Sequence, residues 1–71
     1  MKLDTDEQRN IELCRKAMEN KQRIGVLALM RYTTGIVDKI WFDDLEEQVV
    51  LNTDSGIQRF SASKIAAVNL L

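Results

Sequence analysis

The chain has 71 residues, with 10 basic and 11 acidic side chains, no His, no Pro and one Cys, which fits a single domain over residues 1–71. The absence of His removes the usual general base and metal ligand, and one Cys forms neither an internal disulfide nor a thiolate zinc site. Composition therefore argues against most catalytic templates, and we expect a non-enzymatic protein without cofactor or metal.

Location and association follow from the same counts. No apolar run resembles a signal peptide or a membrane span, and a lone Cys14 suits a reducing compartment, so we expect a soluble cytoplasmic protein. A domain of this size buries only about 60% of the surface that its unfolded chain exposes. We therefore expect association with another copy or with a protein partner.

Charge is unevenly distributed along the chain. Residues 14–31 carry five basic side chains and one acidic, whereas residues 32–48 carry one basic and five acidic. This polarity is consistent with head-to-tail or charge-matched association, and equally with an ordinary solvated surface.

The first segment predicts a helix over about residues 5–20. Asp4 or Thr5 can cap it, acidic residues fill its first turn, and Asn20 is the expected left-handed residue at its end. An apolar stripe at helical spacing, flanked by Leu13, consists of Ile11, Cys14, Ala17 and Met18. Cys14 lies inside this stripe, so a packed thiol is expected rather than a reactive one.

Strand-like patterns replace the helical one after residue 21. They predict strands over about residues 22–32, 36–43, 48–53, 57–60 and 64–70, with a break at 33–35, a hairpin turn at 53–56 and a single helical turn at 61–63. In the second strand, one side is expected to carry Ile36, Ile40 and Phe42, and the other Val37, Lys39 and Trp41.

This order of elements predicts an α+β, mainly β fold. Five short, bent strands closing on themselves leave no exposed edges, and one helix can cover an open end. We predict a small five-stranded SH3-like (Sm-like) barrel capped by an N-terminal helix.

Two clusters were considered as sites. The acidic group at residues 43–47 lacks the spacing of a calcium loop and is interpreted as a solvated hairpin tip. Trp41 with Lys39 offers an aromatic beside a basic residue, which suits base stacking, a protein interface or core packing. The candidate interaction surface consists of Trp41, Lys39, Arg59, Phe60 and Lys64.

Several segments carry a family resemblance: Ala17-Met18-Glu19-Asn20-Lys21 at the helix end, Gly35-Ile36-Val37-Asp38-Lys39-Ile40, Gln48-Val49-Val50-Leu51-Asn52, Asp54-Ser55-Gly56 and Lys64-Ile65-Ala66-Ala67-Val68. In this order the chain resembles the YolD-like family of small bacterial and prophage proteins. The resemblance implies an accessory role beside a lesion-bypass DNA polymerase, and it carries over no catalytic residue.

The chain is also similar to the wider Sm-like group. That group reads RNA with an Asp and a nearby Asn, and with an Arg-Gly or Lys-His pair; the corresponding stretches here are residues 43–47 and 61–64, which lack both. Sm-like proteins join through edge strands, so the resemblance implies a seam between residues 57–60 and 65–71.

Two functions follow as hypotheses. The first is a non-enzymatic adaptor that self-associates and docks on a larger protein, which the YolD-like resemblance implies is a repair polymerase. The alternative is an Sm-like module that binds single-stranded RNA or DNA, using basic residues such as Lys39, Arg59 and Lys64. A small-molecule or nucleotide-sensing role is a third possibility that no sequence feature favours.

Overall fold

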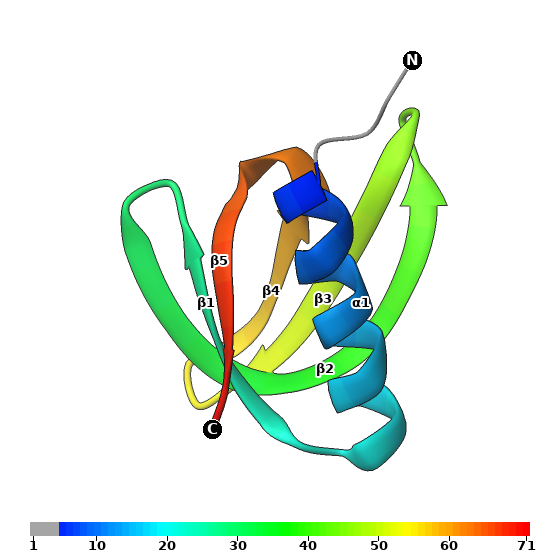
Figure 1. The fold of residues 1–71 in the computed structure, drawn as a ribbon. Helices are drawn as coiled ribbons and strands as arrows, with labels where there is room; N and C mark the ends of the chain where they lie inside the picture. The colour runs from blue at the N-terminus through cyan, green and yellow to red at the C-terminus, as the bar shows by residue number, and fades with distance from the viewer. Residues whose placement is uncertain (1–4) are drawn as a thin grey trace.

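The computed structural model describes residues 5–71, so the proposed capping residue Asp4 lies outside the described part. Helix α1 (Thr5–Asn20) is followed by strands β1 (Arg23–Ala28), β2 (Arg31–Asp43), β3 (Glu46–Thr53) and β4 (Gly56–Ser61). A 3-10 turn, η1 (Ala62–Lys64), then leads into β5 (Ile65–Leu70). The result is a small α+β fold in which α1 lies over one face of a five-stranded antiparallel sheet (Figure 1).

Helix α1 ends at Asn20 as predicted, but the left-handed residue lies one position later than expected. Lys21, not Asn20, takes the left-handed conformation, with φ of 52°. Its N–H donates to the carbonyl of Met18, and the N–H of Gln22 donates to the carbonyl of Ala17 at 2.9 Å. These two bonds form a Schellman motif, which satisfies the last carbonyls of the helix and turns the chain toward β1.

The predicted closed barrel is wrong in one respect, because the sheet is open. The strand order is β4-β3-β2-β1-β5, so β2 is the middle strand and β1 lies inside the sheet between β2 and β5. β4 pairs with β3, and β5 pairs with β1. The chain turns through η1 between the two edge strands, so each keeps one unpaired edge among residues 5–71.

The first hairpin turn lies at Leu29 and Met30 rather than at the expected residues 33–35. Arg31 pairs with Ala28 across a two-residue loop, so the predicted strand over 22–32 ends at Ala28. Strand β2 begins at Arg31, five residues before its predicted start at residue 36. Gly35 lies inside β2, where a Cβ atom would meet the backbone oxygen of Asn52 at 2.5 Å. The glycine permits a close approach of two strands instead of a turn.

A β-bulge at Asp38 changes which side chains of β2 face the core. Val37 pairs with Leu51 and Lys39 with Val50, so Asp38 is the extra residue. The face covered by α1, called the inner face, therefore receives Val37, Ile40 and Phe42. The outer face receives Ile36, Lys39 and Trp41. The predicted sides of Ile36 and Val37 are reversed, because a bulge shifts the alternation by one residue.

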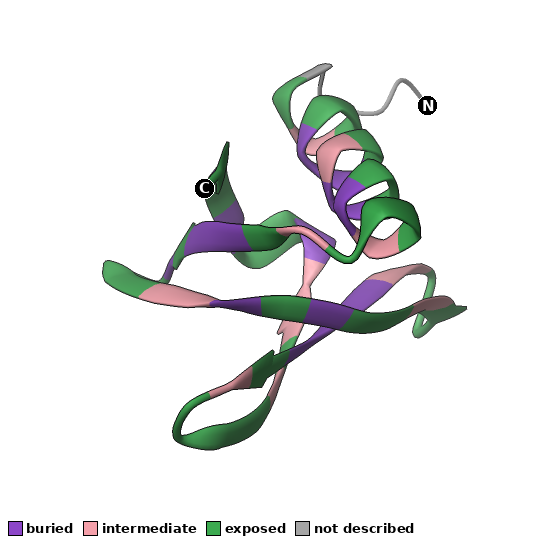
Figure 2. Cartoon of the chain, turned by 90° about the horizontal axis from the view of Figure 1, so that it is seen from below, coloured by how far each residue is buried: buried purple, intermediate pink, exposed green. Residues whose placement is uncertain are grey.

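The core lies between the inner face and the predicted apolar stripe of α1. Ile11, Cys14 and Ala17 are buried there, while Leu13 and Met18 pack at its margin. From the sheet, the buried side chains include Ile24, Val26, Val49 and Leu51. Figure 2 shows the buried stripe of α1 facing the sheet.

Neither helix within residues 5–71 has the length and apolar character needed to cross a membrane.

Candidate functional site

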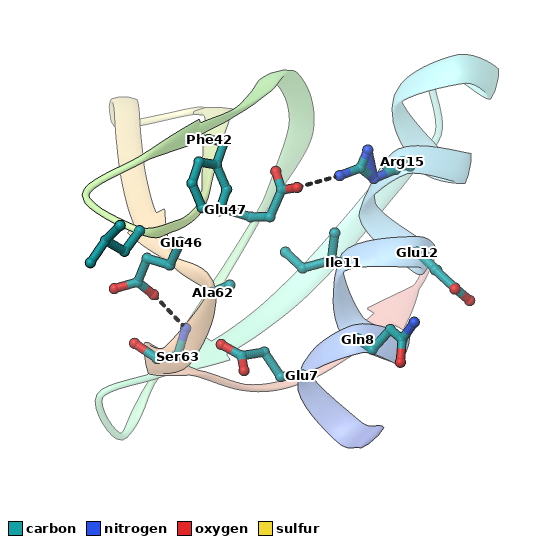
Figure 3. Close-up of a pocket in the computed structure, with 11 residues that line it drawn as sticks. Glu7, Gln8, Ile11, Glu12, Arg15, Phe42, Glu46, Glu47, Ala62 and Ser63 are labelled. Atoms are coloured by element: carbon teal, nitrogen blue, oxygen red, sulfur yellow. Dashed lines mark hydrogen bonds and ion pairs between the residues drawn. The ribbon is translucent and has the colours of Figure 1, made fainter. Parts of the chain in front are cut away.

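A groove opens between α1, the β2–β3 hairpin and η1 (Figure 3). Its volume is about 490 Å³. We call it the acidic groove, and its lining consists of Glu7, Gln8, Ile11, Glu12, Arg15, Phe42, Leu45, Glu46, Glu47, Ala62 and Ser63. Residues from three separate segments therefore meet at one concave surface.

The groove contains apolar side chains that the fold leaves in solvent. Phe42 is 65% exposed and Leu45 is 91% exposed, whereas Ile11 and Ala62 are buried at the base. Leu45 occupies the second position of a two-residue turn, with φ of 66°, which directs the chain back from β2 into β3. Exposed apolar side chains beside a concave surface are typical of interaction sites.

Acidic side chains surround these apolar groups. Among residues 5–71, the lining holds four glutamates and a single cation, Arg15. The Nη2 atom of Arg15 lies 2.7 Å from Oε1 of Glu47, so the one cation is already paired and links α1 to β3. Figure 3 shows Glu7 pointing across the groove toward η1, whereas Glu12 points away. The groove consequently presents net negative charge beside an apolar floor.

Glu46 has a structural task at the groove edge. Its Oε1 accepts a hydrogen bond from the backbone N–H of Ser63 at 3.0 Å, which holds η1 against the start of β3. Hydrogen bonds from Ser63, with a smaller contribution from the charge of Lys64, lower the pKa of Glu46. Because this pKa is lowered, the carboxylate is ionised at neutral pH and adds negative charge at the groove edge.

Sequence reasoning missed this groove. The sequence pattern indicated a solvated tip at residues 43–47, although the turn is only Asp44–Leu45 and Glu46 already belongs to β3. The available signal was the spacing of Glu7, Ile11 and Arg15, which places three lining residues on one face of the helix.

Of the five residues predicted as an interaction surface, three share the outer face. Lys39 and Arg59 both pair with Val50, and Trp41 lies one step along the same face. We call these three residues the basic patch. Phe60 instead pairs with Val49 and packs against the core. It follows Arg59 directly on β4, so its side chain points to the inner face while that of Arg59 points to the outer face. Lys64 ends η1, away from this row.

The basic patch has an ordered centre. The Nζ atom of Lys39 lies 5.1 Å from the ring centroid of Trp41, within range of a cation–π interaction. Gln48 is buried on this face, and its amide oxygen accepts a hydrogen bond from Ser61 Oγ. Trp41 is half-buried, so it is neither a core residue nor a freely exposed ring.

Reactive groups contribute little to either surface. Cys14 has no solvent exposure, and burial raises the pKa of its thiol to about 11. Within residues 5–71, no three side chains of the metal-binding types come together as a metal site.

Comparisons with known proteins add the fold alone. No protein-family model and no curated protein matches the chain. A solved structure, proteasome accessory factor B/C (PafBC) of Arthrobacter aurescens, is similar with a TM-score of 0.85 over 99% of this chain at 6% sequence identity. The chain spans 12% of the length of the PafBC chain. The YolD-like resemblance stays a prediction.

Proposed function

We propose that this protein is a non-enzymatic interaction module whose acidic groove binds an apolar, positively charged segment of a partner protein. The observation that carries the proposal is that exposed Phe42 and Leu45 line the same groove as Glu7, and that Arg15, the one cation of its lining among residues 5–71, is already paired. A cationic apolar segment can bury the two side chains and neutralise the carboxylate. The YolD-like resemblance would make that partner a lesion-bypass DNA polymerase.

The fold supports an adaptor of the SH3-like, Sm-like class. β2 bends strongly across the molecule (Figure 1), and η1 spans only three residues between the two edge strands. We assign the sheet to an SH3-like barrel that is open between β4 and β5. Such a scaffold holds the β2–β3 hairpin and η1 at a fixed separation, which keeps the groove formed without a ligand.

The experiment is an amide chemical-shift titration of isotope-labelled protein with two eight-residue peptides, one of alternating Leu and Lys and one of alternating Leu and Glu. We expect saturable shifts at Ile11, Phe42 and Ala62 with the lysine peptide only. Phe42→Asp should abolish them, while Trp41→Ala on the outer face should not. Equal shifts with both peptides, or none with either, would reject the proposal.

A second candidate is single-stranded nucleic acid at the basic patch. Lys39, Trp41 and Arg59 combine two cations with an aromatic ring on one face, as base-stacking surfaces do. Titration with an oligothymidylate at two salt concentrations should quench Trp41 emission, with weaker binding at the higher salt because phosphate contacts release counterions. Unchanged emission at low salt would remove this candidate.

A further inference from the structure

The β1–β2 hairpin ends in two large apolar side chains in solvent. Leu29 is 75% exposed and Met30 fully exposed, and both have positive φ, at 52° and 62°. A two-residue hairpin loop of this kind favours Asn-Gly, because left-handed backbone costs most other residues about 1–2 kcal/mol each. Hairpin formation alone therefore does not favour Leu and Met here, whereas contact with another molecule does.

The chemistry of this hairpin complements that of the acidic groove. We call Leu29, Met30 and Arg31 the tip; it consists of two apolar side chains followed by an exposed cation. The groove offers exposed Phe42 and Leu45 with Glu7. Met adapts well to irregular apolar surfaces. The tip lies at the end of the basic stretch, residues 14–31. The four glutamates of the groove come from α1 and from the acidic stretch, residues 32–48.

Position decides which molecule supplies the tip. Figures 1 and 2 both place the β1–β2 hairpin and the β2–β3 hairpin at opposite sides of the molecule. No tip residue lines the groove of its own chain. Because both hairpins belong to one hydrogen-bonded sheet, a tip can enter only the groove of another copy.

We propose that the acidic groove of one copy receives the tip of a second copy, with Leu29 and Met30 against Phe42 and Leu45, and with Arg31 beside Glu7. This inference rests on the proposed function, since it names the occupant of the same groove. The tip and the groove are different surfaces, so the contact is heterologous and repeats head to tail into a ring or a chain.

Light scattering after size-exclusion chromatography tests the interface over a concentration series. Wild-type mass should rise with concentration, and Met30→Asp and Phe42→Asp should each remain monomeric. Ile57→Asp is the comparison variant, because Ile57 is 69% exposed on β4 and lies in the alternative seam, outside both the tip and the groove. A monomeric wild type, association that persists in Met30→Asp, or association lost only in Ile57→Asp would overturn the proposal.

Mixing the two variants gives the sharper test. Met30→Asp retains an intact groove and Phe42→Asp an intact tip, so an equimolar mixture should form a one-to-one heterodimer that extends no further. Arg31→Glu should weaken wild-type association at least fivefold, and the double variant Arg31→Glu with Glu7→Lys should restore it. A mixture that remains monomeric, or no rescue by the second charge, would contradict the predicted contact.

The peptide titration separates failure here from failure of the proposed function. A wild type that stays monomeric but binds the lysine peptide at Phe42 overturns only self-docking. Association that survives Phe42→Asp, together with no peptide binding, overturns both.

Discussion

Glu46 joins the start of β3 to η1 through one carboxylate. The backbone N–H of Ser63 donates to it, and this bond, with the charge of Lys64, favours the ionised form. The folded protein therefore holds the pKa of Glu46 below its usual value of 4.5. Ionisation stabilises the fold above that value, and the contribution is lost as the pH falls through the lowered pKa.

Glu46→Gln should therefore lower the free energy of unfolding at pH 7 and make it less sensitive to pH below 4.5. Urea unfolding of both proteins at pH 7 and at pH 3 measures the difference. The two proteins should converge in stability at the acidic end. Parallel curves across this range would show that the carboxylate contributes nothing as an ion.

The thiol of Cys14 affects the free energy of unfolding at alkaline pH. Burial among apolar neighbours raises the pKa of its thiol from 9.0 to about 11, so folding favours the protonated form. This contribution is complete below pH 9 and is lost as the pH rises through about 11. Cys14→Ala should reduce the loss of stability between pH 8.5 and 10.5, measured by urea unfolding. An equal loss in both proteins would contradict the burial of an ionisable thiol.

At the scale of an element, β2 determines most of the architecture. It runs from the tip to the β2–β3 hairpin, bends strongly across the molecule (Figure 1) and changes its face alternation at Asp38. The absence of a side chain at Gly35 lets the Asn52 carbonyl of β3 approach closely. Bend and bulge together curl the sheet around the face that α1 covers.

Gly35→Ala should destabilise the protein by about 1–3 kcal/mol, because its methyl group would overlap backbone that cannot move freely. Gly25→Ala is the control. Its methyl group would meet the Tyr32 ring, which is half-exposed and can swing into solvent. Urea midpoints of the two variants should differ clearly, and a larger loss for Gly25→Ala would contradict this account of β2.

The sequence predicted some elements well and others poorly, according to how directly burial shapes their pattern. The hydrophobic periodicity of the sequence predicted the bounds of α1 and its buried stripe, because burial of one helix face produces that pattern directly. It misplaced the first turn because Leu29 and Met30 carry no turn chemistry, while Thr33-Thr34-Gly35 does. The bulge at Asp38 left no compositional signal, so the faces of Ile36 and Val37 were exchanged.

The candidate site was less predictable than the fold. Lys39, Trp41 and Arg59 could be grouped from strand alternation, since Lys39 and Trp41 lie on the same side of the bulge. The acidic groove could not, because it depends on how α1 crosses the β2–β3 hairpin and on the position of η1. Those are tertiary distances, and local periodicity does not contain them.

At the scale of the whole molecule, the open sheet leaves β4 and β5 with unpaired edges. Ile57 on β4 and Leu70 on β5 are both exposed large apolar residues. The expected seam between these strands stays a prediction, and Ile57→Asp, the comparison variant above, reports on it directly. Edge pairing and tip docking use different surfaces, so Ile57→Asp and Met30→Asp distinguish the two interfaces.

Replacing Leu29 and Met30 with Asn and Gly should raise the free energy of unfolding by about 1–2 kcal/mol, because both new residues accept positive φ readily. The same double variant should lose the concentration-dependent increase in mass. Urea unfolding at a dilution where wild type is monomeric, followed by light scattering at high concentration, measures both effects. A variant no more stable than wild type would show that the turn carries no strain.

The residues of the tip that favour assembly therefore lower the thermal stability of the single copy. A screen that rewards survival at high temperature would converge on Asn-Gly at this turn and discard the contact between copies without any sign of damage to the fold. A stable monomeric carrier domain can therefore be designed by replacing Leu29 and Met30, whereas a design that uses the assembly should keep both residues.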